Sequence, residues 1–333
     1  MLIPKIMKCV KIKEYGPPEN LKYDNEKVPE ISSKEILIHV KASGVNRPDI
    51  LQRKGLYIPP DDASKLPGLE VSGIVIKIGN KVKKFKINQK VCALVHGGGY
   101  AEYCKAHESH VLPIPKGLDF IQAAGIPETY FTVWAKLFDI AKIKKSHTLL
   151  IHGGSSGIGT TAIQLAKLVG CKVITTVGNK QKQKFCKDLG ADLAIVYKEE
   201  DFFKKVQSYT KNKGVNIILD MVGKEYFTKN LKLLKDKGKF ISIAFLSGKD
   251  VQLDLSMILS KRILITGSTL RPRTLREKAK IAKNVKKICW SLFEKKSIKP
   301  IIYKSFNLND AVKAHKLMES SKHIGKIILV NRN

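Results

Sequence analysis

The sequence predicts an α/β protein in two parts, a β-rich first part followed by a doubly wound parallel sheet. Short runs of alternating apolar residues, separated by Gly, Pro and Asn, fill the chain before about residue 125. From about residue 146, strand-like and helix-like segments alternate. Between the first strand and the first helix of this second part stands a glycine-rich stretch, HGGSSGIGTTAIQLAK (152–167). The 333 residues, 43% of them hydrophobic, suffice for two domains with real cores.

The runs before residue 125 predict an antiparallel β domain, because apolar residues alternate with polar ones between turn signals. The tail, residues 306–330, predicts one helix and a final strand that could return to the first domain. The runs of the first part are EILIHVKASGV (35–45), VSGIVIKIGNKV (71–82) and KVCALVHGGGYAEYCKAHESHVLPIP (90–115).

The second part begins with TLLIHGG (148–154), a short buried strand. The helix after it places Ile158, Ala162, Leu165, Ala166 and Val169 on one face and ends at Gly170. Strands alternating with helices predict a parallel, doubly wound sheet. The later segments are the strands KVITTVG (172–178), LAIVY (193–197), NIILDMVG (216–223), GKFISIAFLSG (238–248) and ILITGSTL (263–270), and the helix KQKQKFCKDLGA (180–191).

The glycine-rich stretch approximates the dinucleotide fingerprint G-x-G-x-x-G, with Ser156 in place of the middle glycine. Its position between a strand and a helix predicts a loop whose backbone N–H groups bind a pyrophosphate at the helix N-terminus. The alternative is a tight strand-to-helix turn without a ligand. The residues expected to form the pyrophosphate loop are Gly154, Ser155, Ser156, Gly157, Ile158 and Gly159.

The end of the second strand favours NADPH over NADH. NAD sites usually place an acidic residue there to bind the ribose 2′-hydroxyl. Here no acidic residue occurs between Gly159 and Asp188, whereas Lys180, Lys182 and Lys184 follow the strand. We expect Lys182 to bind the 2′-phosphate of NADPH. The alternative is that these lysines belong to a generally Lys-rich surface.

The formal net charge is +32, and only seven of the 61 basic residues are Arg. The lysines are spread along the whole chain, which favours a solvated basic surface over a dedicated nucleic-acid interface. The six cysteines form no C-x2-C pair, so no structural zinc is expected. With no signal-peptide pattern and no long apolar run, we expect a cytoplasmic protein without membrane spans.

Several stretches together resemble the zinc-independent medium-chain dehydrogenases/reductases of the NADPH:quinone oxidoreductase type, and among them the p53-inducible quinone oxidoreductase subgroup. The resemblance implies a GroES-like catalytic domain (1–125, completed by 300–333), a Rossmann NADPH-binding domain (126–299) and an active site in the cleft between them. The stretches that carry it are SGVNRPDILQRKGLYIPP (43–60), PGLEVSGIV (67–75), GGGYAEY (97–103), AAGIPETYFTVW (123–134), the glycine-rich stretch, NIILDMVG, GSTLRPR (267–273) and HIGKIIL (323–329).

The resemblance also implies chemistry without a metal. Zinc-dependent relatives place a Cys ligand at the position of Asn46 and a His ligand at that of Leu69, and Glu70 alone cannot hold a catalytic zinc. Hydride transfer from NADPH to an easily reduced acceptor, a quinone or another activated carbonyl compound, is therefore expected. Two alternatives stay open: an enoyl or 2-enone reductase of the same fold, and an RNA-binding relative of the quinone reductases.

By resemblance, Asn46, Tyr57 and Thr132 are the expected catalytic residues. The remaining residues expected to bind the cofactor are Gly178, Asn179, Lys182 and Tyr197 near the 2′-phosphate, Val222, then Phe245, Leu246 and Ser247, then Thr269, Leu270 and Arg271, and finally Lys326 from the tail.

Relatives join their Rossmann sheets edge to edge, so the strand at 263–270 predicts a homodimer or homotetramer unless it is an ordinary internal strand.

Overall fold

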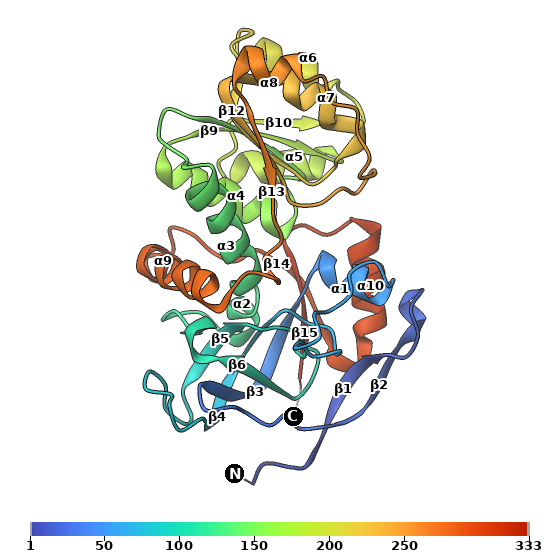
Figure 1. The fold of residues 1–333 in the computed structure, drawn as a ribbon, viewed down its shortest axis with the longest axis vertical. Helices are drawn as coiled ribbons and strands as arrows, with labels where there is room; N and C mark the ends of the chain where they lie inside the picture. Colours follow the sequence, from blue (N-terminus) through green and yellow to red (C-terminus); the bar gives the residue numbers. More distant parts are fainter. Residues whose placement is uncertain (1, 332–333) are drawn as a thin grey trace. The chain divides into compact units, whose positions relative to one another are not determined.

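The computed structural model describes residues 2–331 as two compact units, each with its own sheet (Figure 1). Unit 1 comprises the chain up to Phe131 together with the chain from Arg271 onward, and unit 2 is Thr132–Leu270. The mixed α/β fold that the sequence predicts is confirmed, with a largely antiparallel sheet in unit 1 and a parallel, doubly wound sheet in unit 2.

Unit 1 contains a largely antiparallel sheet in the order β14-β15-β3-β4-β5-β7, with β6 also paired to β3. The final strand β15 pairs antiparallel with β3, so the predicted return of the tail to the first domain is confirmed. Two further strands, β1 (Ile6–Ile12) and β2 (Leu21–Lys27), form a separate two-stranded sheet. The strands of the large sheet are β3 (Glu35–Val45), β4 (Glu70–Ile78), β5 (Lys90–Leu94), β6 (Tyr103–His107), β7 (Val111–Pro113), β14 (Ile302–Asn307) and β15 (Lys326–Val330). Its helices are α1 (Arg47–Arg53), α2 (Phe120–Ala123), α9 (Leu275–Glu294) and α10 (Ala311–Ser320), with 3-10 turns η1 (Pro18–Asn20), η2 (Glu108–His110) and η4 (Leu308–Asp310).

Unit 2 contains a parallel sheet in the order β10-β9-β8-β11-β12-β13. The strand order reverses between β8 and β11, which is where doubly wound sheets bind ligands beyond their carboxyl ends. Its strands are β8 (Thr148–His152), β9 (Lys172–Val177), β10 (Leu193–Val196), β11 (Val215–Asp220), β12 (Leu234–Ser242) and β13 (Leu264–Gly267). Its helices are the π-helix η3 (Trp134–Ile140), α4 (Gly157–Val169), α5 (Lys180–Asp188), α6 (Phe202–Tyr209), α7 (Lys224–Leu233) and α8 (Ser256–Lys261); α3 (Pro127–Val133) spans the boundary between the units.

Helix α4 follows the sequence prediction closely. Ser156 is its N-cap and accepts a hydrogen bond from Gly159 N at 3.0 Å. Gly170 ends the helix in the left-handed region, with φ of 84°, a conformation that glycine adopts at no steric cost. Between these caps Ala162 and Leu165 are buried against the sheet.

The strands of the parallel sheet all end earlier than the predicted segments, and β12 does so by the largest margin. The segment after Ser242 does not continue β12, because its backbone turns to follow the end of β11: Ile243 N donates to Asp220 O at 2.8 Å and Ser247 N to Val222 O at 2.8 Å. Strand β13 ends at Gly267, and within the described chain it pairs with β12 alone, so it is an edge strand. Pairing of two copies at this edge stays a prediction.

Helix α9 differs from the predicted domain division, in which residues 126–299 form the dinucleotide-binding domain. It packs within unit 1, because its buried face lies against η2 and β7. Trp290 Nε1 donates to Pro113 O at 2.9 Å, and His110 Nε2 lies 3.3 Å from Leu275 O. Tertiary packing therefore assigns α9 to unit 1, although it follows β13 in the chain.

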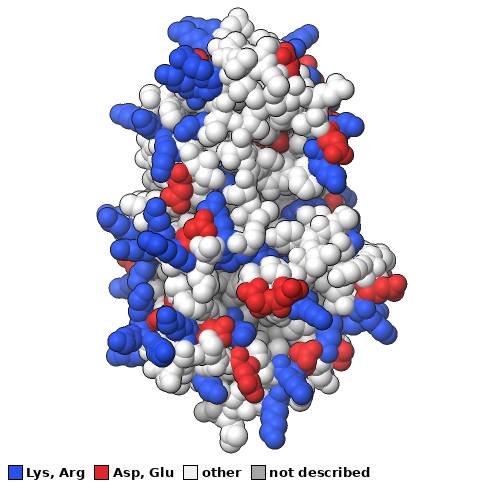
Figure 2. Space-filling view, viewed as in Figure 1, with Lys and Arg blue, Asp and Glu red and all other residues white. Residues whose placement is uncertain are grey.

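The lysines do not gather in a single patch on the face shown in Figure 2, where Lys and Arg alternate with Asp and Glu. This supports the interpretation of the charge as a solvated surface. No helix among residues 2–331 is long and apolar enough to cross a membrane. All six cysteines are buried and unpaired.

Candidate functional site

In unit 2 the predicted cofactor residues follow the carboxyl ends of the strands. The pyrophosphate-loop residues join β8 to α4, and Val222 follows β11. At the next connection, Gly178 and Asn179 lie between β9 and α5, and a Cβ on Gly178 would be 3.6 Å from the Tyr197 hydroxyl. Since the carboxyl ends of parallel strands lie at one edge of a sheet, the fold brings these residues to the same edge. Phe245, Leu246 and Ser247 follow β12 at this edge, Thr269 and Leu270 follow β13, and Thr132 is half-buried in α3.

The backbone of the glycine loop is packed too closely for side chains. A Cβ on Gly154 would lie 2.0 Å from Thr175 Oγ1, and one on Gly159 would lie 2.3 Å from Gly153 O. The first turn of α4 leaves amide N–H groups without acceptors inside the helix, as every helix start does. Close backbone and a helix N-terminus are the two features that a pyrophosphate site requires, so the residues fit a dinucleotide.

Beneath this loop, His152 at the end of β8 is fully buried. Its Nδ1 lies 3.0 Å from Thr176 Oγ1 and its Nε2 lies 2.8 Å from Asn230 Oδ1. Since an amide oxygen only accepts, Nε2 donates to Asn230 and Nδ1 accepts from the threonine hydroxyl. Burial lowers the pKa of His152 from 6.5 to about 4.

This pKa predicts a pH-dependent loss of stability. The unfolded chain takes up a proton on His152 below about pH 6.5, whereas the folded chain resists it down to about pH 4, so stability falls as the pH drops through this interval. Between about pH 7 and about pH 5, the wild type should lose about 2 kcal/mol more unfolding free energy than the His152→Gln variant. Denaturant unfolding of both proteins at the two pH values measures this difference, and equal losses would contradict the prediction.

In unit 1, three side chains form a buried polar group that we call the Lys326 cluster: Asn46, Glu70 and Lys326. Lys326 Nζ lies 2.6 Å from Glu70 Oε1, and it donates to Asn46 Oδ1 at 2.6 Å and to Val45 O at 3.0 Å. The Asn46 amide in turn donates to Glu70 Oε1 at 3.0 Å. All three side chains are at least nine-tenths buried.

Sheet register explains why these residues meet. Strand β15 starts at Lys326, and its next residue, Ile327, lies opposite Val45 at the end of β3. Strand β4 starts at Glu70, and because Val71 lies opposite Ser43, Glu70 stands beside Gly44. A Cβ on Gly44 would lie 2.0 Å from Glu70 Oε1, so the glycine makes room for the carboxylate. Three neighbouring strands, β15, β3 and β4, thus bring the side chains at or next to their ends, Lys326, Asn46 and Glu70, into contact.

The Lys326 cluster does not fit a zinc ion. The oxygens of Asn46 and Glu70 both contact the Lys326 ammonium, so a positive charge already occupies the place where they converge. Leu69 adds no donor. Within residues 2–331, no three His, Cys, Asp or Glu side chains lie close enough together to hold a metal.

Two other predicted residues of unit 1 lie together. The Arg271 guanidinium carbon is 5.8 Å from the centre of the Tyr57 ring, which is a cation–π contact. Arg271 Nη1 donates to Gln52 Oε1 at 2.9 Å and Nη2 to His96 O at 3.2 Å. The side-chain hydrogen bonds of Arg271 and Lys326, both expected at the cofactor, are thus to oxygens of unit 1.

Sequence reasoning missed the residues around Arg271, namely Gln52, His96 and Lys278. Lys278 is buried in the first turn of α9 and donates to Arg271 O at 2.6 Å. The capping box at Thr274 and Glu277 marks the start of this helix and would have placed Lys278 in its first turn. Contacts of Gln52 and His96 with a residue so distant in the sequence leave no such local signal.

Comparisons with known proteins cover the whole chain. The family "Alcohol dehydrogenase GroES-like domain" matches residues 32–136, and "Zinc-binding dehydrogenase" matches residues 157–284. The rat quinone oxidoreductase is 31% identical over 329 residues, 98% of each protein. The crystal structure of Escherichia coli quinone oxidoreductase complexed with NADPH is 29% identical, with a TM-score of 0.87 over 97% of this chain and 99% of that one. A tomato 2-methylene-furan-3-one reductase is 34% identical over 212 residues, 60% of this chain and 54% of that protein.

Proposed function

The chain belongs to the quinone oxidoreductase family of medium-chain dehydrogenases/reductases, and from this premise we propose that it is an NADPH-dependent reductase that transfers a hydride to a quinone. The family fold implies a nicotinamide cofactor. The choice of NADPH, the quinone acceptor, the roles of single residues and a cytoplasmic homo-oligomer are parts of the proposal.

The observation that carries the cofactor choice is the connection from β9 to α5. It contains no carboxylate to bind a ribose 2′-hydroxyl, and Asn179 caps α5 by accepting from Lys182 N at 2.9 Å. Lys182 is buried, and burial lowers the pKa of its ammonium group. A phosphate dianion near this ammonium would offset the cost of removing the charge from water. NADPH carries that phosphate and NADH does not.

The bound nicotinamide supplies the hydride, and this chain's side chains orient the acceptor. Tyr57 offers an aromatic ring on which a flat quinone can stack and a hydroxyl that can donate to a quinone oxygen. The Lys326 cluster fixes the orientation of the Asn46 amide, because the amide oxygen accepts from the Lys326 ammonium and the amide N–H donates to the Glu70 carboxylate. Thr132 is proposed to lie beside the nicotinamide.

Acceptor turnover tests the proposed function. We expect NADPH to be oxidised rapidly with a benzoquinone or a naphthoquinone and slowly with a 2-enone, measured as loss of reduced-nicotinamide absorbance. Tyr57→Leu should raise KM for the quinone, whereas Tyr57→Phe should keep the stacking contribution. Ile58 is an exposed neighbour in the same loop, and Ile58→Ala should leave KM and kcat for the quinone unchanged. Absence of quinone turnover would contradict the proposal.

A second candidate, reduction of an activated carbon–carbon double bond, is favoured by the similarity to the tomato 2-methylene-furan-3-one reductase. The same fold serves several acceptors, because specificity depends on the residues that line the site. Faster turnover of the 2-enone than of either quinone would establish this candidate instead.

A further inference from the structure

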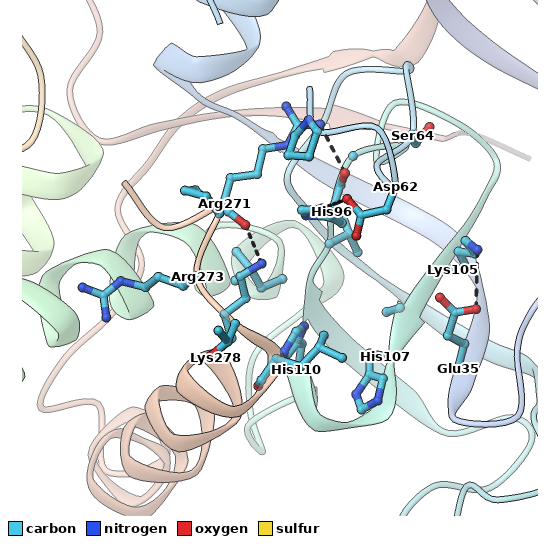
Figure 3. A pocket seen from close by; sticks show the side chains of 18 of the residues that line it. Glu35, Asp62, Ser64, His96, Lys105, His107, His110, Arg271, Arg273 and Lys278 are labelled. Carbon is cyan, nitrogen blue, oxygen red and sulfur yellow. Dashed lines mark hydrogen bonds and ion pairs between the residues drawn. The ribbon is translucent and has the colours of Figure 1, made fainter. Parts of the chain in front are cut away.

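Unit 1 contains a hollow of about 570 Å³ whose walls include Arg271 (Figure 3). Its walls come from the loop around Asp62, the end of β5, the strand β6 with η2, and the start of α9. The ionisable side chains on these walls include Asp62, His96, Lys105, His110, Arg271 and Lys278.

The carboxylates of the hollow already have partners. Glu35 accepts from Ser32 N at 2.7 Å and lies 3.5 Å from the Lys105 ammonium. Asp62 lies 3.1 Å from His96 Nε2. Figure 3 shows both pairs, with the His96 pair beside Arg271 and the Lys105 pair at the other side of the hollow. Neither carboxylate forms an ion pair with Arg271 or Lys278.

Arg271 and Lys278 are buried cations that form no ion pair in the described part of the chain, although the charges of Asp62 and Glu128 act on both of them. Both residues are 5% exposed. Their hydrogen bonds are to the neutral oxygens of Gln52, His96 and Arg271 itself, and within residues 2–331 neither forms an ion pair. Burial lowers the pKa of both groups. The other buried side-chain cations of unit 1, Arg53 and Lys326, are each paired with a glutamate.

Two buried cations without an ion-pair partner on the wall of one hollow are costly for the protein alone, because removing charge from water is unfavourable without a counter-charge in direct contact. An anion in the hollow would supply that counter-charge. The N-terminus of the 20-residue helix α9, which starts on the same wall at Leu275, adds a field of the same sign.

We propose that the hollow binds the oxyanion group, a carboxylate or a phosphate, of a small molecule through the side chains of Arg271 and Lys278. Both cations donate strong, charge-assisted hydrogen bonds to such groups, and the guanidinium can donate two at once. This site goes beyond the proposed hydride transfer and does not depend on it.

Inorganic phosphate is the first probe, with binding measured by calorimetry and by the rise in Tm at constant ionic strength. Lys278→Gln should weaken phosphate binding by roughly tenfold or more, as expected for a lost charge-assisted hydrogen bond. Lys280→Gln is the matched control, because it removes the same charge from an exposed position on α9. Equal phosphate binding by wild type and both variants would mean that the anion binds elsewhere, on the basic surface or at the proposed phosphate sites of the cofactor, and would overturn the proposal.

A second variant tests the site by adding the missing charge. Leu275 lines the hollow, is 53% exposed and precedes Lys278 by one helical turn, so Leu275→Glu places a carboxylate within reach of the ammonium. In the absence of phosphate, Leu275→Glu should have a higher Tm than the wild type. When phosphate is added, the Tm of the variant should rise little. An unchanged phosphate response in Leu275→Glu would contradict the proposal.

A third arm distinguishes the source of the oxyanion. NADPH oxidation is measured with 1,2-naphthoquinone-4-sulfonate and with uncharged 1,2-naphthoquinone. If the oxyanion belongs to the acceptor, phosphate competes with the sulfonated quinone alone, and Lys278→Gln raises KM for that quinone alone. If it belongs to a separate ligand, phosphate affects both quinones equally. Failure of both quinones to react would contradict the proposed function and leave the phosphate-binding results intact.

Discussion

Replacing Lys326 with Met is expected to lower the free energy of unfolding by about 3–5 kcal/mol, because it leaves a fully buried carboxylate without its counter-charge. Glu70 is 0% exposed and would keep only the Asn46 amide and the backbone N–H of Glu128, which donates at 2.8 Å, as partners. Denaturant unfolding measures the loss. Quinone turnover should fall with it, because the Asn46 amide loses the ammonium that fixes its oxygen.

Two further variants make this prediction specific. Lys316→Met breaks an ion pair with Glu19 in which the two side chains are 57% and 54% exposed, and should cost far less stability than Lys326→Met. The double variant Lys326→Met/Glu70→Gln removes both buried charges and should recover part of the stability that Lys326→Met loses. A cost for Lys326→Met no larger than that for Lys316→Met would show that the buried pair does not stabilise unit 1.

The second large effect is expected from Gly159→Ala. The added Cβ would lie 2.3 Å from Gly153 O and 2.6 Å from the carbonyl carbon of Gly154, so the loop must move away from α4. NADPH affinity should fall by roughly tenfold or more, equivalent to at least about 1.4 kcal/mol, because the backbone N–H groups no longer converge on the pyrophosphate. Nicotinamide fluorescence measures the affinity, and the unfolding midpoint of the variant shows whether it is still folded.

Gly178→Ala is the control for stability. Its Cβ would meet the nearest atom, the Tyr197 hydroxyl, at 3.6 Å, an ordinary contact distance. The unfolding midpoint of this variant should therefore match that of the wild type, whereas Gly159→Ala should unfold at lower denaturant. Wild-type NADPH affinity in Gly159→Ala would refute the assignment of the glycine loop as the pyrophosphate site.

The features that the sequence predicts well are those encoded in short stretches. The alternation in EILIHVKASGV defines β3 over the predicted residues 35–45. Ser156 and Gly170 mark the two ends of α4, because a side-chain cap and a left-handed glycine are local requirements. The glycine loop and the parallel sheet follow from the same strand–turn–helix pattern.

The features that the sequence does not reveal depend on pairings between distant segments. Nothing local to Lys326 shows that the register of β15 on β3 brings its ammonium to Glu70. The early end of β12 likewise depends on distant residues, because the segment after β12 donates hydrogen bonds to Asp220 at the end of β11 and to Val222 just after it. The burial of Arg271 and Lys278 without an ion-pair partner becomes visible only when the chain is folded.

The measurement that tests the account most directly is a paired titration with NADPH and NADH, followed by nicotinamide fluorescence, on wild type, Lys182→Ala and Lys184→Ala. Lys184 is an exposed lysine of the same helix and serves as the matched control. We expect the wild type to prefer NADPH, Lys182→Ala to lose roughly tenfold or more in NADPH affinity while its NADH affinity is unchanged, and Lys184→Ala to behave as the wild type. Equal affinity of the wild type for both cofactors, or binding of neither, would contradict the account.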